Sequence, residues 1–208
     1  VRNALNTLDY GKTEKIVIIN ALNTKFWQKD LEQIIPAGPD VVMPPKIESA
    51  EDIKKICDYI SKIEKEKGLE DKKIKIIPII ETSLGLENSF QIAKASPRLE
   101  ALFLGAEDLT ANIVAKRTEK GDEIFYSRSR IIIAANAAGI QAIDTPYTDI
   151  NDEEGLKIDA VFAKDMGFDG KASISPRHVE TINQVFTPSK EEIEFAKEVI
   201  DAINRAEK

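Results

Sequence analysis

Two apolar runs, KIIPIIE (75–81) and ALFLGAED (101–108), decide the fold, and each of them leads into an acidic residue. Apolar runs this short, bounded by turn residues, are typical of buried strands in a parallel sheet. A carboxylate at the end of such a strand, here Glu81 or Asp108, is costly to bury unless something compensates its charge. Hard divalent cations such as Mg²⁺ bind carboxylate oxygens, so the pair predicts a metal site. The structural alternative is a pair of surface carboxylates where loops begin.

Four further runs have the same strand-like character. They are IVIIN (16–20), VVMPP (41–45), IQAIDTPYT (140–148) and KASISP (171–176). Helical patterns lie between the runs, and the chain opens with helix-like sequence. Strands that alternate with helices predict a parallel sheet with crossover helices.

The helix after the second run has clear start and stop signals. Ser49 is a good N-cap, an apolar stripe that includes Cys57 follows, and Gly68 is the expected end. Because Cys57 lies on that stripe, we expect it in the core. Further helices are expected at 1–10, 84–95, 128–139 and 152–167, and from the capping box Ser189-x-x-Glu192 onward.

The repeat is roughly 30 residues long, which is close to the unit of an eight-stranded β/α barrel. The chain offers six such strands, so a closed barrel needs two more; an open doubly wound sheet is the alternative. No glycine fingerprint follows any strand, and acids at strand ends suit the carboxyl face of a barrel. We therefore expect an α/β fold, a single partial (β/α)8 TIM barrel over residues 1–208.

Composition narrows the class of partner. The 208-residue chain has a net charge of −7, and its basic residues sit beside acidic ones, as in EKEKGLEDKK (64–73). A nucleic-acid partner would require a basic face, so we expect none. No run approaches the roughly 18 apolar residues of a membrane span, and no signal peptide is visible. Because the chain has only one cysteine, it can form no intrachain disulfide; these features predict a cytoplasmic protein.

An ordered set of motifs resembles the citrate lyase beta-subunit family, within the HpcH/HpaI aldolase superfamily. The matching segments are INALNT (19–24), PKIESAED (45–52), 78–109, 126–149, DEEGL (152–156), 167–183 and 186–202. The resemblance implies a TIM barrel that binds a divalent metal, usually Mg²⁺. It also implies cleavage or formation of a carbon–carbon bond beside a carbonyl, with citryl-CoA, malyl-CoA or citramalyl-CoA as typical substrates.

The same resemblance implies roles for particular residues. The family's metal glutamate, in an E-T motif, maps onto Glu81, and its metal aspartate, in a G-x-x-D-L motif, maps onto Asp108. The backbone amides of Gly105, Ala106 and Glu107 would bind a substrate carboxylate, and we expect the backbone of Glu107 to matter rather than its side chain. Two protein carboxylates suit Mg²⁺, because substrate and water oxygens occupy its other positions.

The chain departs from the family pattern in several places. Ile18 stands in V-I-I-N where the family usually has a substrate-binding arginine, and Ile174-Ser175-Pro176 replaces I-H-P. Losing an arginine that clamps a carboxylate is not a conservative change. The family's first two strands, and a C-terminal segment that can lend a catalytic aspartate to a neighbouring subunit, have no counterpart here. The general base is therefore unknown.

Four other polar residues have both a functional and a structural interpretation. Lys46 has two interpretations: contact with a substrate carboxylate or CoA phosphate, or a salt bridge at the barrel rim. Asn20 ends the first strand-like run and is a candidate to line the pocket. Asp144 either supports the site or caps a helix, with a structural role favoured. His178, the only histidine, is expected to be a solvent-exposed helix residue.

The main hypothesis is a Mg²⁺-dependent lyase that cleaves citryl-CoA, or another citryl thioester, to oxaloacetate and an acetyl thioester. The alternatives are a malyl-CoA or citramalyl-CoA lyase, a 2-oxo acid aldolase, and a non-catalytic scaffold subunit that binds metal or acyl-CoA. The resemblance further implies an acyl-CoA or acyl-carrier thioester substrate. It also implies a homo-oligomer, a trimer or hexamer, with or without other citrate lyase subunits.

Overall fold

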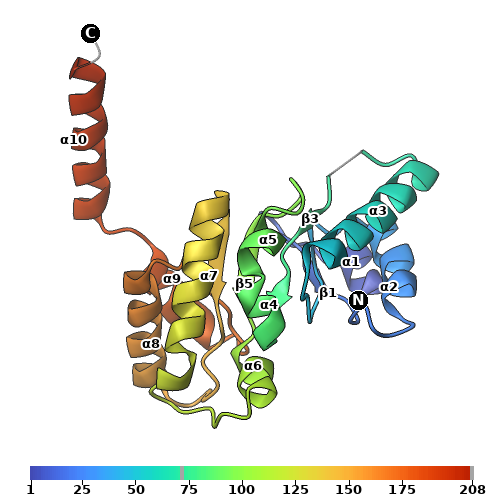
Figure 1. The fold of residues 1–208 in the computed structure, drawn as a ribbon. Helices are drawn as coiled ribbons and strands as arrows, with labels where there is room; N and C mark the ends of the chain where they lie inside the picture. Colours follow the sequence, from blue (N-terminus) through green and yellow to red (C-terminus); the bar gives the residue numbers. More distant parts are fainter. Residues whose placement is uncertain (71–72, 207–208) are drawn as a thin grey trace.

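The computed structural model describes residues 1–70 and 73–206 and shows parallel strands alternating with helices (Figure 1). The strands are β1 (Ile16–Ile18), β2 (Val41–Met43), β3 (Lys75–Ile76), β4 (Ile79–Ile80), β5 (Ala101–Leu104), β6 (Gln141–Asp144) and β7 (Gly170–Lys171). Every pairing is parallel, in the orders β1-β2-β3 and β4-β5-β6-β7. Each run expected to be a strand therefore contains one, except that only Lys171 of the run 171–176 lies in a strand, and the regular segments are shorter than the runs.

The run 75–81 differs most from expectation, because it contributes β3 to one sheet and β4 to the other. Pro78 stands between the two strands and has no N–H to donate to a ladder. The backbone nevertheless stays bonded on both sides. The Ile77 amide donates to the Val42 carbonyl at 3.1 Å, and the Phe103 amide donates to the Pro78 carbonyl at 3.1 Å. This segment therefore joins the two sheets.

The helices expected at 1–10, 49–68, 128–139 and 152–167 and from Ser189 onward are present, whereas the helix over 106–112 was not expected. The helices are α1 (Arg2–Thr7), α2 (Trp27–Ile34), α3 (Ala50–Lys67), α4 (Ser83–Glu87), α5 (Ser89–Ala93), α6 (Ala106–Asn112), α7 (Phe125–Ala138), α8 (Glu153–Met166), α9 (His178–Phe186) and α10 (Lys190–Ala206), with short 3-10 helices η1 (Ile35–Ala37) and η2 (Asp122–Ile124). The helix expected at 84–95 is two short helices that meet at Asn88, whose side chain donates to the Glu48 carbonyl at 2.8 Å. Within the described ranges, no helix is long and apolar enough to cross a membrane.

The α3 helix has the termini that its sequence predicts. Ser49 and Asp52 form a reciprocal capping box, and Gly68 ends the helix in the left-handed conformation with φ of 63°. The apolar stripe between them, including Cys57, is buried.

The main core lies between the strands and the helices that cover them. It contains the strand residues Val42, Ile76, Ile80, Leu102, Leu104 and Ala142 together with helix residues such as Leu31, Ile56 and Ile131. Alternate strand positions face the other way. On β1, Val17 is buried whereas Ile16 and Ile18 are 45% and 62% exposed. Within the described residues, β1, β3, β4 and β7 each pair with a single strand, and because the segment 75–81 joins β3 to β4, the outer edges are β1 and β7.

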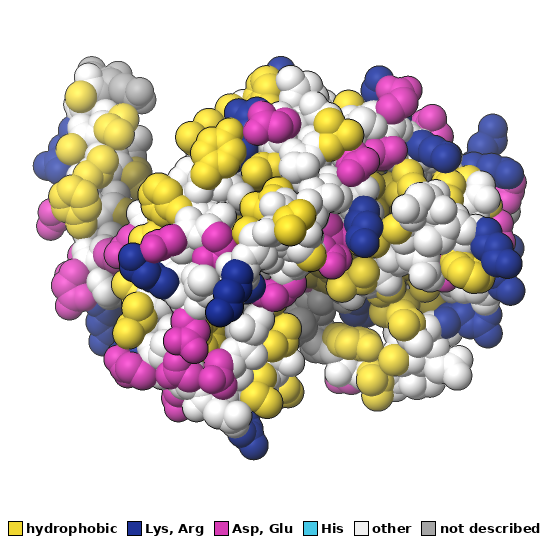
Figure 2. Space-filling model, turned by 60° about the horizontal axis from the view of Figure 1, so that its bottom comes forward, with side chains coloured by type: hydrophobic (Ala, Val, Ile, Leu, Met, Phe, Trp, Pro, Cys, Tyr) yellow, Lys and Arg dark blue, Asp and Glu magenta, His cyan; other side chains and the backbone are white. Residues whose placement is uncertain are grey.

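The α10 helix stands away from the rest of the molecule (Figure 1). Its capping box is confirmed, because Ser189 and Glu192 exchange hydrogen bonds of 2.7 and 3.1 Å. None of its described residues is buried. Figure 2 shows hydrophobic side chains along this helix, at the left of the view. The large exposed apolar residues of α10 are Ile193, Phe195, Val199, Ile200 and Ile203.

Candidate metal-binding active site

The parallel pairing of β4 with β5 brings the two predicted metal ligands together. Glu81 directly follows β4, and Asp108 lies in the first turn of α6, just beyond the end of β5. The sequence had suggested that Asp108 closes a strand. In the structure it belongs to a helix instead. Asp108 lies close enough for its negative charge to act on Glu81, and Lys46 contacts both side chains. Glu81 is 8% exposed, whereas the Asp108 side chain is 57% exposed.

The electrostatics of this pair favour a cation. Burial raises the pKa of Glu81 to about 7, and the negative charge of Asp108 contributes to the rise. The two carboxylates therefore repel each other when both are ionised. A divalent cation bound between them would remove this repulsion, and both groups are hard oxygen ligands of the kind that Mg²⁺ takes. The described residues hold no group of three or more acidic, histidine or cysteine ligands, so a metal here would keep open positions.

Lys46 lies beside the pair through both its backbone and its side chain. Its amide donates to Glu81 Oε1 at 3.0 Å, and its Nζ is 3.9 Å from Asp108 Oδ2. Its backbone is left-handed, with φ of 55°, which is rare for a residue with a side chain. Strained conformations of this kind concentrate at functional sites. The rim salt bridge is present, and the position of Lys46 also suits contact with a substrate carboxylate.

The turn of Gly105, Ala106 and Glu107 is closely packed against Glu81. A Cβ atom at Gly105 would lie 2.7 Å from the Glu81 Cβ, so the approach requires glycine. The Gly105 amide donates to the Ile80 carbonyl at 3.0 Å, and the Ala106 amide donates to Thr145 Oγ1 at 3.3 Å. The amides of Gly105 and Ala106 therefore already have acceptors. The Glu107 amide, in the first turn of α6, has no intrahelical partner, so of the three it is the one available to a substrate.

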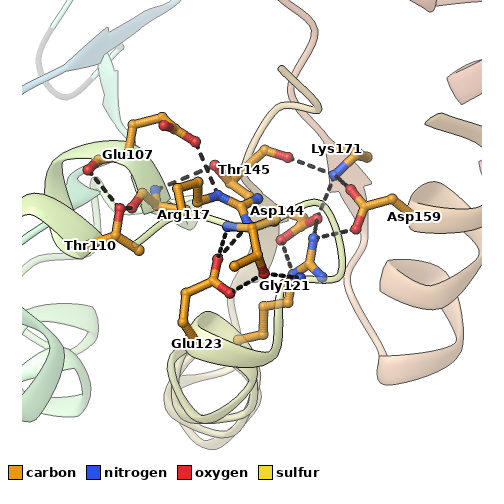
Figure 3. Close-up of polar contacts among 12 residues, drawn as sticks. Glu107, Thr110, Arg117, Gly121, Glu123, Asp144, Thr145, Asp159 and Lys171 are labelled. Carbon is orange, nitrogen blue, oxygen red and sulfur yellow. Dashed lines mark hydrogen bonds and ion pairs between the residues drawn. The ribbon is translucent and has the colours of Figure 1, made fainter. Parts of the chain in front are cut away.

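The Glu107 carboxylate binds an arginine side chain. Arg117 Nε donates to its Oε1 at 3.0 Å (Figure 3). This contact agrees with the expectation that the backbone of Glu107, rather than its side chain, serves the site.

Asn20 and Ile18 are not brought to the acid pair. The Asn20 side-chain amide and backbone amide both donate to Asp30 Oδ2, at 2.7 and 2.9 Å. Ile18 and Asn20 line a separate cavity, to which neither Glu81 nor Asp108 contributes.

The expectation for His178 is wrong, because its side chain is buried and not exposed. His178 is 3% exposed, and within the described residues neither ring nitrogen has a hydrogen-bond partner. It shares one helix face with Thr181 and Ile182, which are also buried. This face is covered because α9 packs against α8. The spacing to Ile182 was the signal in the sequence that could have revealed this.

Asp144 belongs to a buried charge cluster that the sequence did not predict. Its carboxylate accepts from Arg128 at 3.0 and 2.9 Å and from Lys171 Nζ at 2.7 Å (Figure 3). Asp159 Oδ1 accepts from Arg128 at 2.8 Å, and Asp159 Oδ2 forms an ion pair with Lys171 Nζ at 2.6 Å. The side chains of Arg128, Asp144 and Lys171 are at most 1% exposed. The favoured expectation of a helix cap is therefore wrong, because Asp144 ends β6 and its carboxylate binds Arg128 and Lys171.

The comparisons with known proteins identify the family. The family described as HpcH/HpaI aldolase/citrate lyase matches residues 1–176. The chain belongs to this family. Citrate lyase subunit beta of Leuconostoc mesenteroides subsp. cremoris is 41% identical over 99% of this chain and 68% of its own length. The mitochondrial citramalyl-CoA lyase of Mus musculus is 35% identical over 97% of this chain and 62% of its own length. Both of these relatives are named as lyases or lyase subunits, as expected.

Solved structures of the family confirm the parallel α/β fold of the TIM-barrel type. A citrate lyase from Burkholderia xenovorans matches with a TM-score of 0.85 over 99% of this chain and 69% of its own, and at 23% identity it shows the fold alone. The citrate lyase beta subunit of Mycobacterium tuberculosis complexed with oxaloacetate and magnesium is 31% identical, with a TM-score of 0.74 over 90% and 79% of the two chains. A CitE structure from the same organism, with magnesium, acetoacetate and coenzyme A, is 31% identical, with a TM-score of 0.76 over 98% and 72%.

Proposed function

We propose that this chain is a Mg²⁺-dependent carbon–carbon lyase that cleaves a citryl thioester to oxaloacetate and an acetyl thioester. The observation that carries the proposal is that Glu81 and Asp108 meet beyond the carboxyl ends of the paired strands β4 and β5, where Lys46 contacts both of them. Family membership supports it, and so does the related beta subunit whose structure holds oxaloacetate and magnesium.

Each residue at this edge has a task in the proposed reaction. Glu81 and Asp108 hold the metal, and when bound Mg²⁺ supplies Lewis-acid stabilisation for the substrate hydroxyl as it becomes a ketone. The Glu107 amide, at the start of α6, donates to the substrate carboxylate and orients it. Lys46 adds a positive charge beside Asp108 and thereby favours binding of an anionic substrate.

The acyl carrier and the assembly form part of the same proposal. We propose that the thioester is carried by CoA or by an acyl-carrier subunit, and the related structure with coenzyme A supports the first of these. A homo-oligomer is expected, and sedimentation velocity would determine its size.

The direct test is release of oxaloacetate from citryl-CoA in Mg²⁺, after EDTA treatment, and after Mg²⁺ is restored. We expect EDTA to abolish release and Glu81→Gln to lower kcat/KM by at least about 100-fold, because even a group that only supports a metal ligand contributes ~10–100-fold. Glu100→Gln is the matched control. Glu100 pairs with Lys75 at the amino end of β5, which is the opposite end of the strand from the proposed metal site. Full activity of Glu81→Gln would contradict the metal role.

A second candidate is a lyase for citramalyl-CoA or malyl-CoA. The observation that favours it is Ile18, which is 62% exposed where the family usually has arginine. The similarity to a citramalyl-CoA lyase supports the same possibility. Comparing kcat/KM for citryl-CoA, citramalyl-CoA and malyl-CoA decides between the candidates. If citryl-CoA is cleaved least efficiently of the three, the first proposal fails on its substrate while the metal role stands.

A further inference from the structure

The first turn of α6, which carries Asp108, is held from two sides (Figure 3). On one side, Thr145 Oγ1 accepts the Ala106 amide at 3.3 Å. On the other side, Arg117 Nε donates to Glu107 Oε1 at 3.0 Å. The second contact is partly exposed, with 53% of the Glu107 side chain accessible, whereas Thr145 is completely buried. Thr145 therefore makes the more constrained of the two contacts.

Thr145 is itself fixed by the buried charge cluster. It directly follows β6, and its carbonyl accepts Lys171 Nζ at 2.7 Å. The same ammonium group is bound by Asp144 and Asp159, at 2.7 and 2.6 Å. Two hydrogen bonds, to Asp144 and to the Thr145 carbonyl, and the ion pair with Asp159 leave Lys171 little freedom to move. A continuous chain of hydrogen bonds thus runs from this cluster through Thr145 to the start of α6.

Asp108 needs such support more than Glu81 does. Glu81 is buried and receives the Lys46 amide, whereas the Asp108 side chain is 57% exposed and has its nearest cation, Lys46 Nζ, 3.9 Å away. Its helix, α6, has only 7 residues. Metal ligands work when surrounding contacts hold them within about 0.5 Å of the productive position. The contacts that orient α6 therefore decide whether Asp108 faces Glu81.

We propose that Thr145 is a positioning residue for the metal site. Its hydroxyl holds the Ala106 amide so that the first turn of α6 presents Asp108 to Glu81, and Lys171 fixes Thr145 in turn. This inference rests on the proposed function, because it requires Glu81 and Asp108 to bind a divalent cation.

The test measures metal affinity and not turnover. Mn²⁺ takes the same oxygen ligands as Mg²⁺ and its free form is detected by electron paramagnetic resonance. Thr145→Val removes the acceptor and keeps the shape, and we expect it to raise the Kd for Mn²⁺ about 10-fold, as loss of a group supporting a metal ligand does. Thr145→Ser retains a hydroxyl and should keep the Kd within about twofold of the unmodified protein.

Two controls make the result specific. Thr181→Val removes another buried hydroxyl with a 3.3 Å bond, in α9, and should leave the Kd unchanged. Circular dichroism confirms that each variant is folded. If Thr145→Val does not fold, Thr145→Cys replaces it, because the thiol has a similar size and is only a weak acceptor. It too should raise the Kd.

The outcomes separate this inference from the proposed function. If the unmodified protein binds Mn²⁺ and Glu81→Gln does not, the metal site stands. An unchanged Kd in folded Thr145→Val, or in its cysteine replacement, would then overturn only the positioning role, as would an equal loss in Thr181→Val. If the unmodified protein does not bind Mn²⁺, the proposed metal site and this inference fall together.

Discussion

Burial and the charge of a neighbouring residue both raise the pKa of Glu81. Burial disfavours the ionised carboxylate, and Asp108 adds like-charge repulsion, so its pKa rises to about 7. The Lys46 amide opposes the shift by donating to Oε1, but does not cancel it. Metal-free Glu81 therefore carries its proton over a pH range in which an ordinary glutamate is ionised.

This shift predicts that the metal-free protein loses stability as pH rises from about 4.5 to about 7. In that range folded Glu81 binds more protons than unfolded Glu81 does, so the free energy of unfolding decreases with pH. Urea unfolding in EDTA at a series of pH values measures the slope. Glu81→Gln should lose this component, and Glu100→Gln should keep it. An identical slope in the unmodified protein and Glu81→Gln would show that Glu81 is not its source.

Among the elements, α3 agrees with the prediction from sequence, whereas the run 75–81 differs from it. Ser49 and Gly68 set the ends of α3 as predicted, because capping depends on side chains next to the helix. The break between β3 and β4 could be suspected from Pro78, but their assignment to two sheets could not. Strand pairing depends on partners distant in sequence, which local patterns do not contain.

At the α3 terminus, Ser49→Ala should lower the free energy of unfolding by about 1 kcal/mol, because the Asp52 amide loses its side-chain acceptor. Urea denaturation measures the change. Ser49→Thr keeps a capping hydroxyl and should lose clearly less. If the threonine variant is as unstable as the alanine variant, the hydroxyl is not what stabilises this end of α3.

In the whole molecule, the helices make unequal contributions to the core. Ile56 of α3 is completely buried, whereas Ile200 of α10 is 57% exposed. Both lie on the apolar side of an amphipathic helix, so their sequences look alike. The difference arises because α3 covers the sheet while α10 stands apart (Figure 1). That residues 1–208 form a single domain stays a prediction.

The two isoleucines provide a matched test of this arrangement. Ile56→Ala should lower the free energy of unfolding by about 2–5 kcal/mol, because it leaves a cavity in the core. Ile200→Ala should change it by less than about 0.5 kcal/mol, as exposed substitutions usually do. Denaturant unfolding of the dilute full chain measures both. A loss above about 1 kcal/mol for Ile200→Ala would show that α10 is packed in solution.

The sequence by itself determined the alternation of strands and helices, the ends of α3 and the placement of Glu81 and Asp108 after neighbouring strands. Local periodicity, capping residues and ordered family motifs are sufficient for such features. Only the tertiary structure decided that His178 is buried, that Asp144 meets Arg128 and Lys171, and that Thr145 holds the start of α6. These contacts join elements that are distant along the chain, so they depend on how helices and strands pack and not on any local pattern.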